Sequence, residues 1–190
     1  MAVAQATETI TEEQYVRLAL MNEDEPLEFF KGRIREKPFM SAEHNDAMLL
    51  LGVQLVQQLD RNQFRVRVNA GRTRRPSVSV FIPDVMVIPT HLERAQRRGP
   101  GHLEIYSDPL PFVAEFWSPS TGDYDVETKL PEYQERGDRE IWRPHPYNHA
   151  VIAWRRQPDG TYAQLTFRGG KVQLFALPEV TIDLDALFDV

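Results

Sequence analysis

The chain has 190 residues, of which 42% are hydrophobic and 26% charged, with a formal net charge of -6 and no cysteine. This composition is ordinary for a single globular domain of a reducing compartment, and it excludes the zinc sites that depend on cysteine. The apolar runs are shorter than the roughly 18 residues of a membrane span, and no secretory leader is recognisable. We therefore expect a cytoplasmic protein without a membrane segment.

The N-terminal part of the chain predicts a tail followed by a short helix. We expect residues 1–10 to be a disordered tail and residues 11–190 to form one domain. Thr11 and Gln14 have the spacing of a capping box, which predicts a helix that begins just after Thr11. An acidic linker, NEDEP, ends this helix.

A hairpin and a long amphipathic helix are predicted next. Residues 28–34 have the pattern of a strand, a turn at Lys31 and Gly32, and the start of a return strand. Ser41 is a candidate N-cap for a helix from Ala42 to about Leu59. The helix has a wide apolar face, so we expect it to pack on a sheet through Met48, Leu49, Leu50, Leu51, Val53, Leu55, Val56 and Leu59.

The middle of the chain is basic and rich in strand patterns. Residues 61–98 contain nine arginines against two acidic residues, a balance of +7, so the rest of the chain carries -13. Residues 64–68 alternate apolar and basic side chains, residues 71–76 predict a basic turn, and residues 78–88 predict a strand that contains Asp84. We expect this basic stripe to contact a nucleic-acid backbone, although a solvated strand face explains the pattern equally well. The arginines assigned to this contact are Arg65, Arg67, Arg72, Arg74 and Arg75.

The second half of the chain predicts a further helix and the remaining strands. Residues 90–108 form a polar connection of the length that is often functional. Residues 112–117 predict an apolar strand that contains Glu115, and the helical segment after it ends at Gly137. Four short strands and a closing turn or short helix follow at residues 140–142, 150–154, 162–167, 171–175 and 182–188. This order of elements predicts an α/β fold, with a mixed β-sheet flanked by helices.

Asp84 and Glu115 are the centre of the functional prediction. Each is a lone acid in an apolar strand, and burying an ionised carboxylate costs several kcal/mol unless a proton or a cation compensates. If the two strands are neighbours, the carboxylates converge, and a divalent metal converts their repulsion into binding. Oxygen ligands with room for water suit Mg²⁺ or Mn²⁺ better than zinc. The structural alternatives are a turn cap for Asp84 and a salt bridge to an arginine for Glu115.

Several residues occur in an order that is typical of a known family, namely the segment LEFFKGRI at 27–34, His44, Asp84 in "PD", Glu115 in "EFWSPST", Asp125, Lys129, Tyr133, Gly137, Trp142 and the closing segment 177–188. On these residues the chain resembles the Uma-two family of endonucleases, within the PD-(D/E)XK phosphodiesterase superfamily, from about Thr11 onward. The resemblance implies a restriction-endonuclease-like fold and a metal-dependent endonuclease that acts on DNA. It also implies that Asp84 and Glu115 hold the metal.

Lys129 takes the place of a displaced lysine in this resemblance. The superfamily usually has its lysine two positions after the second acid, where this chain has Trp117. We expect Lys129 to orient the attacking water or to stabilise the phosphate, with the carbonyl of Phe116 as a further metal ligand. Pro131 either kinks the helix just after Lys129 or marks its start, so the direction of the amine stays open.

Two further residues are expected to complete the site. The resemblance places Glu28 near the metal, and His44 lies in the first turn of the long helix, where it can contact a phosphate or a water on the metal. Asp125 precedes Lys129 by four positions, a spacing that pairs an acid with a base on a helix. The alternatives are an exposed strand acid for Glu28, a surface or capping histidine for His44, and an ordinary surface pair of Asp125 with Lys129.

The alternative function is a nuclease-fold nucleic-acid-binding or regulatory protein without turnover. The displaced lysine, Pro131, the acidic net charge and His145, where the family commonly has an aspartate, favour it. His145 and His149 have a spacing seen in zinc sites, but no cysteine or carboxylate accompanies them. Three aromatic residues are expected in the core rather than in a base-stacking platform: Trp142, Tyr147 and Trp154. The choice between DNA and RNA, and between a monomer and a symmetric homodimer, stays open.

Overall fold

The structure is a computed structural model that describes residues 9–22 and 24–189. Most of the tail predicted at residues 1–10 therefore lies outside the described residues. Ile10 is described, and it is attached to the domain: its amide donates to the carbonyl of Gly32 at 2.9 Å, and its side chain packs against a buried cluster. Within the described ranges, no helix is long and apolar enough to cross a membrane.

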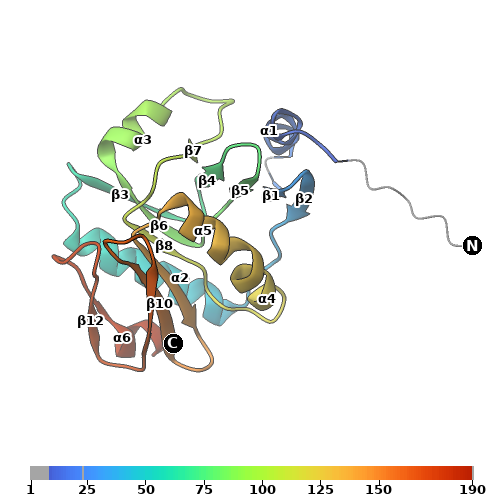
Figure 1. The fold of residues 1–190 in the computed structure, drawn as a ribbon. Helices are drawn as coiled ribbons and strands as arrows, with labels where there is room; N and C mark the ends of the chain where they lie inside the picture. The colour runs from blue at the N-terminus through green and yellow to red at the C-terminus, as the bar shows by residue number, and fades with distance from the viewer. Residues whose placement is uncertain (1–8, 23, 190) are drawn as a thin grey trace, which may run out of the picture.

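The strands form two mixed sheets and a small two-stranded one (Figure 1). Their bounds are β1 Leu27–Phe30, β2 Arg33–Glu36, β3 Phe64–Val68, β4 Arg72–Arg75, β5 Ser79–Phe81, β6 Val85–Pro89, β7 Ile105–Tyr106, β8 Phe112–Ala114, β9 Glu140–His145, β10 Ala150–Arg156, β11 Tyr162–Phe167, β12 Lys171–Gln173 and β13 Thr181–Asp183. The six-stranded sheet has the order β11-β10-β9-β8-β6-β3, and its β8 and β9 pair is parallel. The five-stranded sheet has the order β2-β1-β5-β4-β7, and its β4 and β7 pair is parallel.

Helices cover both faces of the six-stranded sheet. The helices are α1 Glu12–Met21, α2 Ala42–Gln58, α3 Thr90–Gln96, α4 Gly122–Tyr124, the π-helical turn η1 Asp125–Lys129, α5 Leu130–Arg136 and α6 Leu184–Phe188. Phe112 and Ala114 of β8 share a core with α2 and α6, whereas Val113 packs with Tyr133 of α5. Successive strand residues point to opposite faces, so the apolar side chains of β8 contribute to the core on both faces of the sheet. The predicted α/β class, a mixed sheet flanked by helices, is confirmed.

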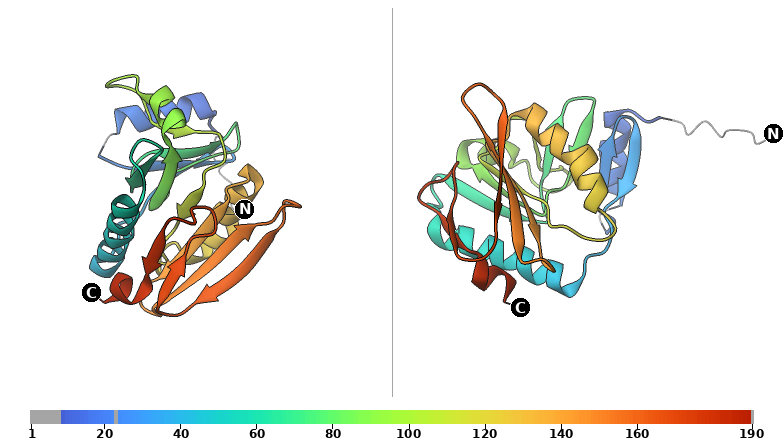
Figure 2. Two further views of the ribbon diagram at one scale, coloured as in Figure 1. Left: turned by 90° about the vertical axis from the view of Figure 1, so that its left-hand side faces the viewer. Right: turned by 60° about the horizontal axis from the view of Figure 1, so that its bottom comes forward.

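The elements of the N-terminal and C-terminal parts of the chain lie at opposite ends of the molecule (Figure 2). The five-stranded sheet and α1 form a separate buried cluster at one end, centred on Tyr15 and Phe29. The hairpins of β9, β10 and β11 lie at the other end. The segment from β5 to β6 connects the two sheets, and the candidate site lies at this connection.

Several local predictions agree with the structure. Thr11 and Gln14 form both hydrogen bonds of a capping box. Ser41 caps α2, because its side chain accepts a hydrogen bond from the amide of His44 at 3.2 Å. Gly137 ends α5 with a φ of 82°, a left-handed conformation that glycine adopts without strain.

The apolar face of α2 is narrower than we expected. Leu51 and Leu55 are fully buried, but Leu49, Val53 and Val56 are exposed. The exposed three lie about 100° or more around the helix from the buried row, beyond the stripe that a single sheet can cover.

The strand predicted over residues 78–88 is two strands in different sheets. β5 belongs to the five-stranded sheet and β6 to the six-stranded sheet, and the chain passes between them at Pro83 and Asp84. Proline has no amide hydrogen to donate to a ladder, which favours a break at this point. The basic turn predicted at 71–76 is also wrong, because β4 pairs there with β5 and β7.

Candidate active site

Asp84 and Glu115 lie on neighbouring strands at equivalent positions. β6 and β8 are antiparallel, and Val85 is opposite Ala114. Asp84 directly precedes Val85 at the start of β6, and Glu115 directly follows Ala114 at the end of β8. Both acids therefore lie at the same end of this pair of strands. Both side chains are buried. The condition for converging carboxylates, that the two strands are neighbours, is met.

Asp84 is held as an ionised acid by three partners. Its Oδ2 accepts a hydrogen bond from the Phe116 amide at 2.7 Å and lies 3.1 Å from His44 Nε2. Its Oδ1 lies 2.7 Å from the ammonium group of Lys37. Burial disfavours the charged form, but Lys37 and His44 outweigh burial and lower the pKa of Asp84.

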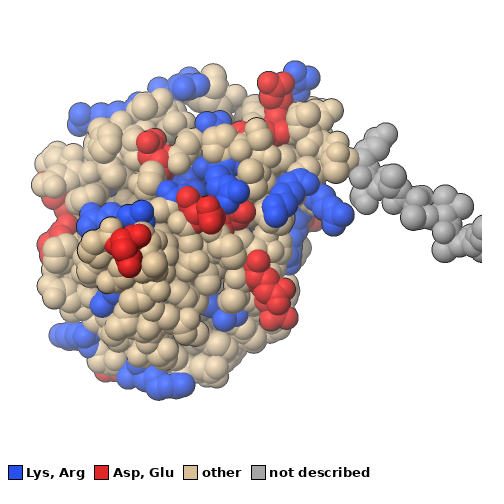
Figure 3. Space-filling view, viewed as in Figure 1, with Lys and Arg blue, Asp and Glu red and all other residues tan. Residues whose placement is uncertain are grey.

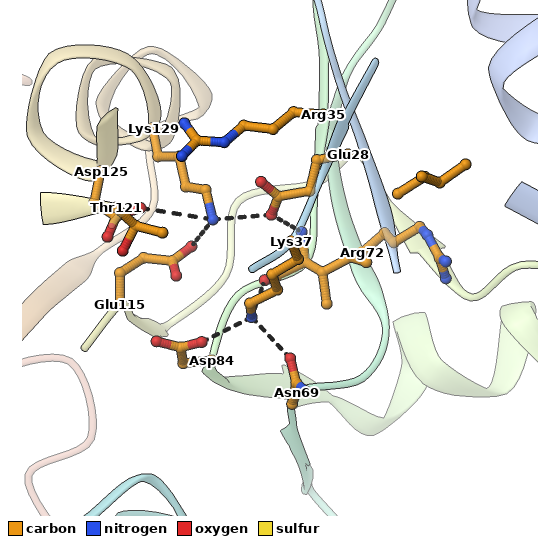
Figure 4. A network of polar contacts seen from close by, with 12 residues as sticks. Glu28, Arg35, Lys37, Asn69, Arg72, Asp84, Glu115, Thr121, Asp125 and Lys129 are labelled. Carbon is orange, nitrogen blue, oxygen red and sulfur yellow. Dashed lines mark hydrogen bonds and ion pairs between the residues drawn. The ribbon is translucent and has the colours of Figure 1, made fainter. Parts of the chain in front are cut away.

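Lys37 is a site residue that the sequence does not reveal. Its ammonium group is buried and donates to Asn69 Oδ1 and to the Ile82 carbonyl, both at 2.8 Å (Figure 4). The Ile82 carbonyl is available because the chain leaves β5 there. Nothing in the segment REKPF distinguishes this lysine from a surface one, since only the tertiary fold brings it to Asp84.

Lys129 points into the group of acids. Its Nζ lies 2.8 Å from Glu28 Oε1, 3.2 Å from Glu115 Oε1 and 3.7 Å from Asp125 Oδ1 (Figure 4). Burial opposes the charge, but Glu115 and Glu28 outweigh burial and raise the pKa of Lys129 well above its ordinary value. Its acidic neighbours therefore hold Lys129 in the charged form, in which it donates hydrogen bonds.

The helix geometry explains how Lys129 reaches the acids despite Pro131. Lys129 is the last residue of η1, and Pro131 is the second residue of α5. The amide of Leu130 donates to the carbonyl of Asp125, five residues earlier, so the missing amide of Pro131 falls where the hydrogen-bond pattern changes from π-helical to α-helical. The helical path continues through Lys129, and neither a loop nor a sharp end removes it from the site.

Glu28 links Lys129 to Ile82, where the chain passes from β5 of one sheet to β6 of the other. Its Oε1 accepts hydrogen bonds from the Ile82 amide at 2.9 Å and forms the ion pair with Lys129. Both polar groups of the Ile82 backbone are thus bound by site residues, the amide by Glu28 and the carbonyl by Lys37. The break after β5 and the candidate site stabilise each other.

Glu115 differs from Asp84 in its protonation. Burial, together with the neighbouring Asp84 and Asp125, outweighs Lys129 and raises the pKa of Glu115 to about 8. The hydroxyl of Tyr133 donates a hydrogen bond to Glu115 Oε1 at 2.5 Å. Tyr133 is one of the residues that carry the family resemblance, and this contact gives it a role in the site.

The raised pKa of Glu115 predicts how its replacement changes stability with pH. Between pH 4.5 and 8 the unfolded chain ionises this acid while the folded chain keeps it protonated, so the wild type loses stability as the pH rises. Glu115→Gln resembles the protonated acid and lacks this loss. We expect the variant to gain on the order of a few kcal/mol relative to the wild type between pH 5 and pH 8.5. Urea unfolding of both proteins in EDTA measures this difference, and a pH-independent difference would contradict it.

The charge of the site fits one divalent cation. Four buried carboxylates surround two ammonium groups, which leaves a surplus of two negative charges when all are ionised: Glu28, Asp84, Glu115 and Asp125 against Lys37 and Lys129. Among the described residues, Asp84 Oδ1 and Asp125 Oδ1 are buried with an ammonium group as their ion-pair partner, Lys37 at 2.7 Å and Lys129 at 3.7 Å. The cavity between these side chains measures about 10 Å³, roughly the space of one water molecule or ion.

The side chains alone do not complete a metal coordination shell. Within residues 9–22 and 24–189, no group of three His, Asp or Glu side chains is arranged to hold a metal ion. A metal held by Asp84 and Glu115 would therefore need backbone carbonyl and water ligands, as is usual for Mg²⁺. It would also compete with Lys37 for Asp84.

The arginines assigned to nucleic acid do not form one continuous stripe. Arg65 and Arg67 lie on β3 of the six-stranded sheet, whereas the other three lie on β4 of the five-stranded sheet. Three of the five have carboxylate partners: Arg67 with Glu93 and Glu104, Arg74 with Glu12, and Arg75 with Glu132. Basic and acidic side chains are interspersed on the face shown in Figure 3. Their contact with a nucleic acid stays a prediction.

The two histidines of the HPYNH segment have separate environments. His145 stacks on Trp117 with ring centroids 4.2 Å apart, and His149 stacks on Phe188 at 5.6 Å. This arrangement does not support the zinc alternative. The core prediction is right for Trp142 and Trp154 but wrong for Tyr147, which is 48% exposed.

Comparison with known proteins shows the fold and the family of the chain. The chain is similar to a protein of Anabaena variabilis whose crystal structure is described as "a putative nuclease belonging to DUF820", with a TM-score of 0.69, 17% sequence identity, and coverage of 85% of this chain and 89% of the other. At this identity the similarity shows a common fold. The search of curated proteins finds no match. A model of the family Uma2, described as "Putative restriction endonuclease", matches residues 12–185, so the chain belongs to the Uma2 family.

Proposed function

We propose that this chain is a metal-dependent endonuclease that hydrolyses phosphodiester bonds, with DNA as its substrate. The observation that carries the proposal is the meeting of Asp84 and Glu115 with the buried ammonium group of Lys129. Two carboxylates and a fixed ammonium group, close together at the end of two paired strands, are the side chains that a metal-dependent hydrolysis of this type uses. The Uma2 family supports a nuclease of the restriction-endonuclease kind.

Each residue has a distinct role in the proposed reaction. Mg²⁺ or Mn²⁺, held by Asp84, Glu115 and the Phe116 carbonyl, would polarise the phosphate and lower the pKa of a water molecule. Lys129 keeps its proton, so it stabilises negative charge that develops on the phosphate rather than acting as a base. His44 fixes Asp84, and Glu28 fixes Lys129, which makes both of them positioning residues.

The substrate must approach from outside the cavity. A space of about 10 Å³ admits neither a sugar nor a base, so only a phosphate oxygen or a water molecule can enter it. DNA is preferred over RNA because the family description names restriction endonucleases. The arginines of β3 and β4 would add contacts with the phosphate backbone, which position a nucleic acid without reading its sequence.

One observation favours the alternative, a nuclease-fold nucleic-acid-binding protein without turnover. Lys37 already neutralises Asp84, at 2.7 Å, where an active enzyme would use this acid for a metal. If the ammonium group cannot be displaced, the site is a closed network of ion pairs that stabilises the fold.

Cleavage of supercoiled plasmid DNA separates the two functions. We expect nicking or linearisation in Mg²⁺ or Mn²⁺ and none in EDTA. Asp84→Asn and Glu115→Gln should each reduce the rate by at least about 100-fold, the scale on which the loss of an electrostatic stabiliser acts. Glu179→Gln, which changes an exposed acid far along the chain, is the matched control and should cleave normally. Binding of plasmid DNA and of a circular single-stranded DNA, without cleavage of either in Mg²⁺ or Mn²⁺, would support the non-catalytic alternative.

A further inference from the structure

The loop between β2 and α2 connects the bottom of the cavity with an exposed aromatic side chain. Lys37, at the start of this loop, reaches Asp84, and Phe39 and Met40 line the cavity. Phe39 is 98% exposed, the most exposed large hydrophobic side chain among the described residues. Single exposed apolar side chains are common on protein surfaces, and Phe39 differs from them by its place beside the cavity of the acids.

Tyr147 is a second exposed aromatic residue, and it is held in a fixed orientation. Its hydroxyl lies 2.9 Å from Ser41 Oγ, in the same loop region as Phe39. Its ring stands edge-on to Trp117 and to His145, with interplanar angles of 87° and 84°. Because Tyr147 is anchored by these contacts and still 48% exposed, it presents a rigid ring to the solvent.

The support beneath Tyr147 is connected to the catalytic strand. Trp117 follows Glu115 by two positions, and the next residue, Ser118, lines the cavity. A Cβ atom at Gly122 would lie 2.5 Å from Nε1 of Trp117, so the indole occupies its place only because residue 122 is a glycine. The stacked rings of Trp117 and His145 therefore support Tyr147 from the segment that follows Glu115.

Two arginines near the cavity are placed to contact phosphates. Arg35 lines the cavity, and its guanidinium lies over the ring of Tyr124 and bonds to the Ser120 carbonyl. Arg143 bonds to the carbonyl of Gly122 at 2.8 Å. These contacts are with backbone carbonyls, and among the described residues neither guanidinium forms a salt bridge, although the charges of Asp125 and Asp123 act on Arg143.

We propose that Phe39 and Tyr147 form a stacking platform for unpaired nucleobases at the mouth of the phosphodiester site. The proposal rests on the proposed function, and it narrows the substrate to single-stranded nucleic acid or to a segment with unpaired bases. Stacking on an aromatic side chain stabilises a bound base by about 1–3 kcal/mol, and this does not depend on base identity. In a duplex the base faces are covered by their neighbours, so a duplex cannot use the platform without unstacking.

Binding of labelled oligonucleotides in EDTA tests the platform without any requirement for catalysis. The probes are a single strand of about 12 nucleotides, the same strand as a duplex, the same strand with abasic positions in its centre, and its RNA equivalent. We expect the intact DNA or RNA single strand to bind at least about tenfold more tightly than the duplex and the abasic strand. Phe39→Ala and Tyr147→Ala should each weaken single-strand binding by about 5- to 100-fold.

Two control variants make the test specific for ring stacking. Tyr147→Phe keeps the ring and should bind like the wild type, and Phe175→Ala removes a phenylalanine of similar partial exposure that does not line the cavity. Equal binding of intact and abasic strands, no detectable binding of any strand, or wild-type affinity in both alanine variants would overturn the platform.

The platform and the proposed hydrolysis fail in different ways. If single strands bind through Phe39 and Tyr147 but no substrate is cleaved in Mg²⁺ or Mn²⁺, the platform stands and the hydrolysis is refuted. If a duplex is cleaved and both alanine variants cleave it at the wild-type rate and bind single strands normally, the hydrolysis stands and the platform is refuted.

Discussion

Lys129→Met is expected to lower the free energy of unfolding by about 3–5 kcal/mol at pH 8, because it leaves buried acids without their cation. The ammonium group of Lys129 lies within 4 Å of Glu28, Glu115 and Asp125, and all of these side chains are buried. Methionine fills a similar volume but supplies no charge, so the loss measures the electrostatic contribution rather than a cavity. Urea unfolding in EDTA gives the free energy directly.

A second substitution distinguishes lost charge from lost packing. Lys129→Met combined with Glu28→Gln should recover part of the stability, because one unpaired acid is removed and the amide oxygen still accepts the hydrogen bond from Ile82. Lys171→Met changes an exposed lysine and should have little effect. If Lys129→Met is as stable as the wild type, the ion pairs at Lys129 do not hold the site together.

Lys37→Met is expected to increase the affinity for Mn²⁺ by at least about tenfold. Lys37 is the ammonium group that lies against Asp84, and it repels any cation that binds there. At about 4 Å and an effective dielectric near 20, this repulsion amounts to several kcal/mol. Without metal the same variant should be less stable than the wild type, because Asp84 loses its counter-ion, and Mn²⁺ should restore the loss.

Calorimetric titration of Mn²⁺ measures this competition without a substrate. Asp84→Asn should abolish binding in both the wild-type and the Lys37→Met background, and Lys171→Met should bind like the wild type. Equal or weaker binding by Lys37→Met would show that Lys37 supports the metal site instead of competing for it. No binding by either protein would favour the non-catalytic alternative.

Local sequence patterns predict the elements of this fold well where short-range chemistry decides them. The cap at Ser41, the hairpin turn at Lys31 and Gly32, and the end of α5 at Gly137 each depend on residues within one turn of chain. The patterns fail where the same apolar run supplies two sheets. Residues 78–88 are apolar except for Ser79 and Asp84, so their division into β5 and β6 depends on which strands pair with each half.

The sequence by itself determined which acids are unusual, because Asp84 and Glu115 are charged residues within apolar runs of the sequence and burial makes such residues costly. Only the tertiary structure decided how that cost is met. Lys37 comes from a distant loop, Lys129 from a π-helical turn, and Tyr133 from the helix after it. Charge neutralisation depends on distances of a few ångströms between segments far apart in the chain, and no periodicity or spacing within one segment encodes those distances.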